Sequence, residues 1–464
     1  MNLEKIFTER IDTNEINIEN KTIDVNNCIV ENWHISNKNS IIFTNCQFDG
    51  KEFVFYKNNG SKLIVYFREC VFNCDVKFNN CYFKALKFIN TKKIKTLEIT
   101  KSIRIEELYF KNTHDCRYKL EGDIIITNNK SIDQINISKI NHHSGEFIFT
   151  NNDIKKNTTV PTKASSFAFF KKSSFNKADF SETKFSEEVN FDGMVLTNNK
   201  GHLNFENCTF GKSYFNETNF GNSAYFNGSI FNNDAHFISC QNIENTIADF
   251  SGCTIYKNIN FSYSKFKSLI IKNVLFDNLV SFEETEFDNI TFERIVFQKP
   301  AFFDGIKINN LKNCTRKTLR IIKLQLQKTE NKIDYNNFKA FELDALNREL
   351  NKKDWKDKFV LWLNSKSSNH GLNWLQGITF TIIVGLVFYS IYFSFENFTQ
   401  PFIINCESLN VFLIGYFKFL VPSYSSPIEN GLSKWYLYIP FLIGKIFVTY
   451  GIYQTIVSFR KFKL

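Results

Sequence analysis

The sequence predicts a mainly β fold, a solenoid of short strands, followed by amphipathic helices and a two-helix transmembrane hairpin. Three observations favour this class: Phe recurs at every fifth position, this spacing ends after Phe303, and two long apolar stretches lie near the C-terminus. A period of five fits neither the α-helix, which repeats at about 3.6 residues, nor the strand, which repeats at 2. The chain must therefore turn a corner once per repeat.

The repeat unit is clearest in "FNKADFSETKF" (175–185). Ala178 and Thr183 lie two positions before a Phe, and the polar Asp179 lies between Ala178 and Phe180. One unit is thus a small inward residue, a polar outward residue, an inward Phe and two turn residues. One-residue slips, as from Phe185 to Phe191, are expected to form bulged corners. We expect the repeat core to contain Phe175, Phe180, Phe185, Phe205, Phe210, Phe215, Phe220, Phe226, Phe250, Phe261, Phe282, Phe287 and Phe292.

Four of these units, "ADFSE" (178–182), "VNFDG" (189–193), "TNFGN" (218–222) and "ADFSG" (248–252), resemble the repeats of the pentapeptide-repeat family. The resemblance implies a right-handed quadrilateral β-helix with four repeats per coil. On this resemblance we expect residues 1–150 to form a degenerate N-terminal pentapeptide-repeat β-helix and residues 165–305 to form the regular part. The Lys-rich and Asn-rich stretch at 150–165 either separates two stacks of coils or forms a side loop.

The cysteines are expected to be structural residues that do not form disulfides or metal sites. Eleven Cys residues are present, and no pair of C-x-x-C units could build a zinc site. Cys46, Cys70, Cys81, Cys208 and Cys253 each lie two residues before a Phe or Ile of the repeat, where Ala178 lies before Phe180. We expect them to be small buried residues.

Composition and motifs argue against several function classes. The net charge of +10 is spread along the chain as single lysines, so no nucleic-acid partner is expected. The tripeptide "GKS" (211–213) resembles the end of a phosphate loop, but Glu206 replaces the first Gly of that motif and Phe210 and Phe215 flank it in register with the repeat. We expect no enzymatic activity, no cofactor and no metal site.

Residues 311–365 are predicted to be helical. Two amphipathic helices are expected to close the open end of the solenoid, because an uncovered strand edge invites pairing with another chain. Trp355, Phe359 and Trp362 follow at helical spacing among lysines, which is typical of a helix in a membrane interface. The apolar faces of the two amphipathic helices consist of Leu319, Ile322 and Leu326 in the first and Phe338, Phe341 and Ala345 in the second.

Residues 372–464 are predicted to form the transmembrane hairpin. The first span, 372–395, carries no charge, and the second, 435–459, contains Pro440 and Lys445. Both are long enough to cross about 30 Å of hydrocarbon. Lys and Arg precede the first span and recur in the terminal "RKFKL", which predicts cytoplasmic N- and C-termini. No secretory signal is visible, so we expect the bulk of the chain to stay in the cytoplasm. The two spans, together with the resemblance to the pentapeptide-repeat family, imply a two-span protein of the bacterial inner membrane.

A short apolar helix is expected between the spans at 409–421, re-entrant or interfacial because it is too short to cross. This order of segments loosely resembles the two-transmembrane pore module of potassium channels. However, "LVPSYSSP" (420–427) stands where the selectivity filter would follow. As a whole, the chain resembles bacterial membrane-bound pentapeptide-repeat proteins with a C-terminal two-span region.

Lys445 is the main candidate site residue, because a cation within a span is costly unless it is paired, reaches the interface or faces water. It either lines a pore that favours anions, with Thr449 one turn further on, or extends to the interface or contacts a carboxylate. Gly444 and Gly451 allow close helix packing or a hinge, or are ordinary transmembrane glycines.

Two functions follow from these features. In the first, the solenoid is a scaffold or sensor that binds an unknown protein partner and is held to membrane lipid by the hairpin. In the second, the chain is an ion channel, anion-conducting or non-selective, gated by the solenoid. The channel requires a homo-oligomer, because one hairpin cannot enclose a pore.

Overall fold

The computed structural model describes residues 15–26, 28–31, 40–57, 59–91, 93–111, 119–138, 140–154, 167–197, 201–241, 247–396, 406–423, 436 and 438–460. The chain divides into two compact units, Met1–Cys314 and Thr315–Leu464, which are treated separately below. Parts of three expectations lie outside the described residues: most of the stretch at 150–165, the end of "LVPSYSSP" and the last four residues of "RKFKL".

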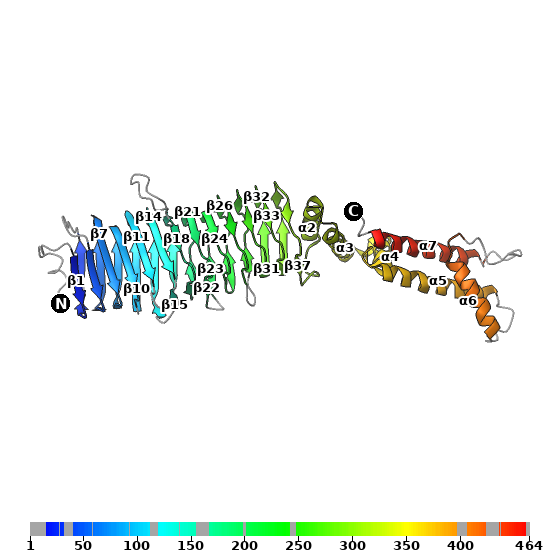
Figure 1. Ribbon diagram of the computed structural model, residues 1–464, viewed down its shortest axis with the longest axis horizontal. Coiled ribbons are helices and arrows are strands. Elements are labelled where there is room, and N and C mark those ends of the chain that lie inside the picture. The colour runs from blue at the N-terminus through cyan, green and yellow to red at the C-terminus, as the bar shows by residue number, and fades with distance from the viewer. Residues whose placement is uncertain are drawn as a thin grey trace. The chain divides into compact units, whose positions relative to one another are not determined.

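The first unit is a parallel β-solenoid of stacked coils, as predicted. Figure 1 shows strands of successive coils side by side in chain order. Ile255 is paired with Phe276, and Phe276 with Phe297, so each of these coils takes 21 residues. The coil that begins at Ile247 has four short sides, at 247–249, 254–255, 259–260 and 265–266. Four sides of about five residues therefore explain the period seen in the sequence.

The described strands form three parallel sheets. The first contains β1 (Glu15–Glu19), β4 (Ser40–Thr44), β7 (Asn59–Arg68), β9 (Tyr82–Ile89), β11 (Arg104–Lys111), β14 (Ile132–Ser138), β17 (Asp153–Ile154), β18 (Phe167–Phe169), β21 (Lys184–Asn190), β24 (Thr209–Tyr214), β26 (Ile230–Phe231), β27 (Ala235–His236), β29 (Thr254–Ile255), β30 (Ile259–Asn260), β32 (Leu275–Phe276), β33 (Val280–Ser281), β35 (Val296–Phe297) and β36 (Ala301–Phe302). The second contains β2 (Thr22–Asp24), β3 (Cys28–Glu31), β5 (Gln47–Asp49), β6 (Glu52–Tyr56), β8 (Val71–Asn79), β10 (Lys93–Thr100), β13 (Asp123–Thr127), β16 (Phe147–Thr150), β20 (Ala178–Asp179), β23 (His202–Asn204), β25 (Ser223–Tyr225), β28 (Ile247–Asp249), β31 (Lys265–Lys272), β34 (Glu286–Glu293) and β37 (Lys307–Ile308). The third contains β12 (Lys119–Glu121), β15 (Asn141–Ser144), β19 (Ser174–Phe175) and β22 (Val195–Leu196).

The pairing continues across the stretch at 150–165. Strand β14 pairs with both β17 and β18, and β16 pairs with β20. The strands before and after this stretch therefore belong to the same stack of coils.

The interior of the solenoid is a set of stacked phenylalanine columns. Along one column the ring centroids of Phe180 and Phe205 are 5.0 Å apart, those of Phe205 and Phe226 4.9 Å, and those of Phe226 and Phe250 4.5 Å. These distances match the spacing of about 4.8 Å between paired strands. Phe215 of the neighbouring column meets Phe226 edge to face at 5.5 Å, so each ring combines both favourable aromatic geometries. None of the thirteen ladder phenylalanines named above is more than 2% exposed.

The slip from Phe185 to Phe191 is a bulge, as predicted. The register between β21 and β24 shifts after Phe185, where the chain of β21 has one more residue than its partner. Gly211 faces this bulge, and a Cβ atom there would lie 1.8 Å from the carbonyl oxygen of Glu187. The glycine of the "GKS" tripeptide is therefore explained by the close approach of two backbones.

The inward position two residues before a ladder Phe or Ile is often Cys, Ser or Thr, and this position recurs from coil to coil. Cys208 Sγ donates to the Phe180 carbonyl at 3.0 Å, and Ser229 Oγ donates to the Phe205 carbonyl at 2.6 Å. Cys253 makes the equivalent contact with Phe226 at 2.9 Å. Burial raises the pKa of the Cys253 thiol to about 12. The five cysteines named from the sequence are all buried, so they act as small donors within the core.

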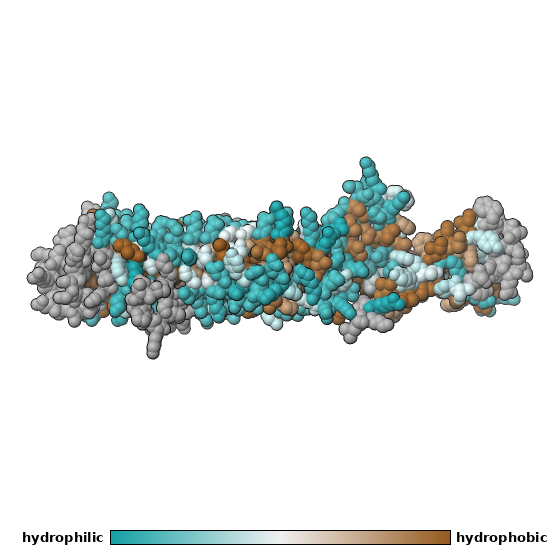
Figure 2. All heavy atoms as spheres, turned by 90° about the horizontal axis from the view of Figure 1, so that it is seen from above, coloured by the Kyte–Doolittle hydropathy of each residue, from teal (hydrophilic) through white to brown (hydrophobic). Residues whose placement is uncertain are grey.

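The second unit contains the helices α2 (Arg316–Lys328), α3 (Lys332–Glu349), α4 (Trp355–Ser368), α5 (Trp374–Glu396), α6 (Cys406–Leu420) and α7 (Tyr438–Arg460). Thr315 caps α2 by accepting a hydrogen bond from the Thr318 amide, and Asn331 caps α3 in the same way through Asp334. Helices α5 and α7 are long and apolar enough to span a membrane by length and composition. In Figure 2 hydrophobic residues dominate the described surface of this C-terminal part, whereas the solenoid is mostly hydrophilic.

Candidate functional site in the C-terminal helices

The packing face of α5 is built from small and aromatic residues spaced three or four apart. Gly377, Thr381, Gly385, Tyr389 and Tyr392 are buried along one side of the helix. A Cβ atom on Gly385 would lie 2.5 Å from Leu420 of α6, so glycine lets these two helices approach closely. The larger apolar residues of α5, such as Ile383 and Val387, are instead half exposed.

Gly444 and Gly451 occupy the matching face of α7. A Cβ atom on Gly444 would lie 2.6 Å from Phe388 and from Phe419, and one on Gly451 would lie 2.3 Å from the Thr381 hydroxyl oxygen. Both glycines are therefore contact points between α7 and its neighbours. Of the two interpretations drawn from the sequence, this geometry fits close helix packing.

Lys445 contacts the C-terminal end of α6. Its Nζ atom donates to the carbonyl oxygens of Phe419, at 2.8 Å, and Val421, at 2.5 Å. The ammonium group also lies 5.1 Å from the centre of the Phe419 ring and 5.6 Å from that of Phe441. The last carbonyls of a helix have no partners within it and carry a partial negative charge, so a cation there is stabilising. In the described structure Lys445 thus pairs with backbone oxygens rather than with a carboxylate.

Thr449 is not part of this contact. It lies one turn beyond Lys445 and its side chain is exposed on the outside of α7. The four candidate residues therefore separate into three that organise the packing of α5, α6 and α7 and one on the outer surface.

Buried polar residues join α4 to α7. Ser368 Oγ donates to Gln454 Oε1 at 2.8 Å, and the amide of Gly371 donates to Ser368 Oγ at 2.9 Å. Asn369 ends α4 in a left-handed conformation. The sequence reasoning did not find this junction, although the Ser-Ser-Asn-His-Gly order at 367–371 is typical of a helix end.

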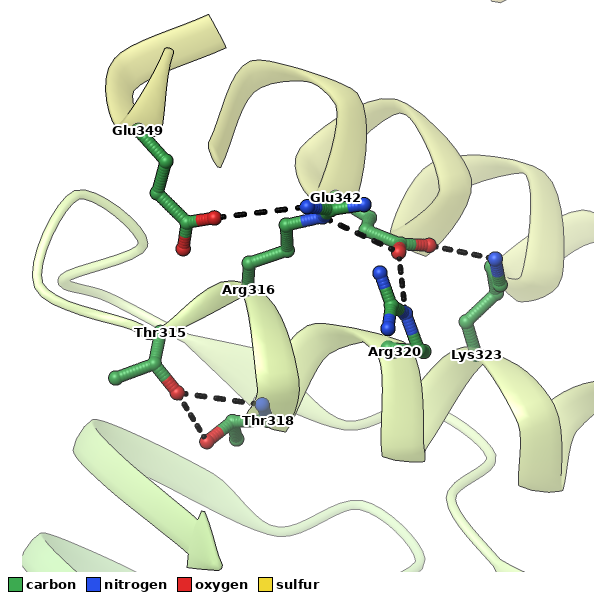
Figure 3. Close-up of polar contacts among 7 residues, drawn as sticks. All are labelled: Thr315, Arg316, Thr318, Arg320, Lys323, Glu342 and Glu349. Atoms are coloured by element: carbon green, nitrogen blue, oxygen red, sulfur yellow. Dashed lines mark hydrogen bonds and ion pairs between the residues drawn. The ribbon is translucent and has the colours of Figure 1, made fainter. Parts of the chain in front are cut away.

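One carboxylate on α3 forms ion pairs with three cations of α2 (Figure 3). Glu342 pairs with Arg320 Nε at 2.8 Å, Lys323 Nζ at 2.5 Å and Arg316 Nε at 3.7 Å. Burial opposes ionisation of Glu342, but the hydrogen bonds from Lys323 and Arg320 outweigh it and hold the pKa of this carboxyl below its usual value. Sequence reasoning missed this cluster because it considered only the apolar faces of the two helices.

The described residues contain no group of three His, Cys, Asp or Glu side chains placed to hold a metal ion. The chain was compared with models of protein families, with curated proteins and with solved structures, and none of these comparisons found a match.

Proposed function

We propose that the chain is a pentapeptide-repeat protein of the bacterial inner membrane, in which the hairpin of α5 and α7 anchors a cytoplasmic solenoid that binds a protein partner. The observation that carries the anchoring is the burial of the two helices. In the 18-residue stretch of each helix that is most apolar, only 22% of α5 and 28% of α7 are buried. A helix in the core of a soluble protein would be mostly covered, whereas a membrane helix exposes its apolar side chains to lipid.

Membership of the pentapeptide-repeat family is supported by the dimensions of the coil. The four matching units recur in register, and coils of 21 residues with four sides accommodate four such units and one extra corner residue. The inward positions two before Phe226 and Phe250 carry the small residues Ala224 and Ala248, which are paired in register and fully buried.

The partner-binding role is supported by an apolar column on the outside of the solenoid. Ile230, Thr254, Leu275 and Val296 are stacked in register on β26, β29, β32 and β35. Ile230, Leu275 and Val296 are 36%, 37% and 51% exposed, on a surface that is otherwise largely hydrophilic. A partner that covers this column would remove apolar surface from water.

The scaffold function predicts that charge in this column prevents partner binding. The Leu275→Glu/Val296→Glu variant should lose partners that the unmodified chain captures from native membranes. Thr291→Glu, which adds charge to the outward face of β34 in another sheet, should keep them. Identical partner sets for all three proteins would contradict the role of this column. Alkaline carbonate extraction tests the anchor separately, since an integral protein stays in the membrane pellet.

We prefer the membrane-anchor function over the channel function because of the position of Lys445. Its ammonium group is engaged with the carbonyl oxygens of Phe419 and Val421, which gives the residue a packing role without a pore. Light scattering of the solubilised protein tests the alternative, because a channel needs a ring of subunits.

A further inference from the structure

We propose that a cavity in the helical unit binds a phosphate-bearing anion, of the kind carried by the headgroup of an acidic phospholipid. The cavity has a volume of about 630 Å³ and is lined by the end of α2, the first half of α3, the turn between α4 and α5, and the end of α7. Residues 326–339 form one continuous stretch, and the turn at 370–371 and the end of α7 are brought to it from further along the chain, so the cavity is a product of the fold of this unit.

The lining is positively charged. Lys332 and Lys339 of α3 and Arg460 of α7 line the cavity, together with a single acidic lining residue, Glu330. Within the described residues, none of the three cations takes part in an ion pair, unlike the cations of α2 that surround Glu342. Their charge is therefore available to a ligand, and Tyr335 adds a phenol to the same wall. Cations around a pocket of this size favour a phosphate group.

His370 forms part of the buried wall of this cavity. Its Nε2 atom is held by Asp344 Oδ1 at 3.0 Å, and its side chain is only 1% exposed although it lines the cavity. Because a carboxylate only accepts, Nε2 carries a proton. The other ring nitrogen, Nδ1, is buried and has no hydrogen-bond partner among the described residues. His370 therefore closes the wall of the cavity beside the cations, held there by Asp344, and its inaccessible Nδ1 atom does not reach the ligand.

The position of the cavity favours a lipid as the source of the phosphate, an argument that rests on the proposed anchoring. Arg460 follows Phe459, whose ring stacks on Trp374 at 5.2 Å at the start of α5. Aromatic residues at the end of a hairpin are typical of the headgroup level of a membrane. If α5 and α7 cross the bilayer, the cavity lies where phospholipid headgroups lie.

The test is a titration of the full chain, purified in dodecyl maltoside, with three soluble probes. These are dioctanoyl phosphatidylglycerol, dioctanoyl phosphatidylcholine and glycerol 3-phosphate, with intrinsic tryptophan fluorescence as the readout. Phosphatidylglycerol should bind saturably and phosphatidylcholine at least about tenfold more weakly. The variant Lys332→Gln/Lys339→Gln/Arg460→Gln should lose at least about tenfold in affinity.

Two controls separate a site from general attraction and from misfolding. Lys352→Gln/Lys353→Gln/Lys356→Gln removes the same charge from surface positions outside the cavity and should change affinity less than about twofold. Lys332→Arg/Lys339→Arg/Arg460→Lys should retain binding, which shows that the effect requires charge. Equal losses in the two Gln triples, or no saturable binding of either phosphate probe, would overturn the proposal.

The source of the phosphate is decided by the third probe. Binding of glycerol 3-phosphate as tight as that of phosphatidylglycerol supports the site with a soluble phosphate as its ligand, whereas much weaker binding supports a lipid. Because the titration uses detergent, it does not depend on insertion. A chain released by carbonate that still binds glycerol 3-phosphate through the three cations would refute the anchor and keep the site.

Discussion

The solenoid and the hairpin of α5 and α7 differ in where they place small residues and large apolar ones. In the solenoid, large apolar rings such as Phe226 are inside and polar residues such as Asp249 lie outside. In the helical unit, Gly444, Thr381 and Ser458 are inside, while large apolar residues cover much of the outer surface of α5 and α7. The solenoid is therefore stabilised by removing apolar area from water, and the packing of the hairpin depends on the close approach of helices. Truncating a large residue in the solenoid and enlarging a small residue in the hairpin should therefore both be destabilising.

The largest effect is expected for Phe226→Ala in the solenoid. The ring is fully buried between Phe205 and Phe250, and truncation leaves a cavity that should lower the free energy of unfolding by about 3–5 kcal/mol. Tyr225→Ala, one residue earlier on the outward face, is the matched control and should cost less than about 1 kcal/mol. Urea denaturation followed by circular dichroism measures both. Equal losses would contradict the assignment of the two faces.

Enlarging a residue should be harmful in the hairpin. Gly444→Leu places a side chain against Phe388 and Phe419 and should destabilise the helical unit by about 1–3 kcal/mol. Thr449→Leu, on the exposed side of α7, should be nearly neutral. Thermal unfolding in detergent, followed by near-ultraviolet circular dichroism, distinguishes the two variants. A strong effect at Thr449 would instead indicate that this face contacts another subunit.

Lys445 tests whether charge inside the hairpin serves packing or conduction. Lys445→Met removes two hydrogen bonds to the end of α6 and should cost about 2 kcal/mol, whereas Lys445→Arg should retain most of the stability. Thermal unfolding in detergent measures both variants, and equal stability of the Met and Arg variants would contradict this packing role.

Reconstitution separates the two roles of this lysine. Lys445→Glu in lipid bilayers should leave ion conductance at the background of protein-free membranes, as for the unmodified chain. A current whose ion selectivity changes with the charge reversal would support the channel function and contradict the proposal that the hairpin is only an anchor.

Much of the solenoid could be predicted from the sequence, because the spacing of its inward residues is set within each coil and is repeated along the chain. The spacing of Phe175, Phe180 and Phe185 encodes the sides of a coil, and the slip to Phe191 encodes a bulge. The partners of Lys445 could not be predicted, because they are backbone oxygens brought close by the return of α7 past α6. The cavity around Lys332 and Arg460 likewise depends on three segments that are separated in the sequence. Spacing along the chain contains no such information.

The charge cluster of α2 and α3 predicts a dependence on pH. The pKa of Glu342 is lower in the folded chain than its ordinary value of 4.5, so its contribution to stability is present above pH 4.5 and is lost as the pH falls through the folded pKa. Glu342→Gln should cost about 1 kcal/mol at pH 7 and remove this part of the acid sensitivity. Thermal unfolding between pH 3 and pH 7 checks both. An unchanged acid profile in the Gln variant would exclude Glu342 as the titrating group.

The smallest effect is expected at an inward position that is Cys in one coil and Ser in another. Cys253 donates to the Phe226 carbonyl as Ser229 does to that of Phe205, so Cys253→Ser should change the free energy of unfolding by less than about 1 kcal/mol. Cys253→Val cannot donate and should be clearly more destabilising, although Val is apolar. Because burial raises the pKa of this thiol to about 12, iodoacetamide should modify it only after unfolding. If Val were tolerated as well as Ser, the position would require only small volume, and the hydrogen bond that repeats along the solenoid would be incidental to its stability.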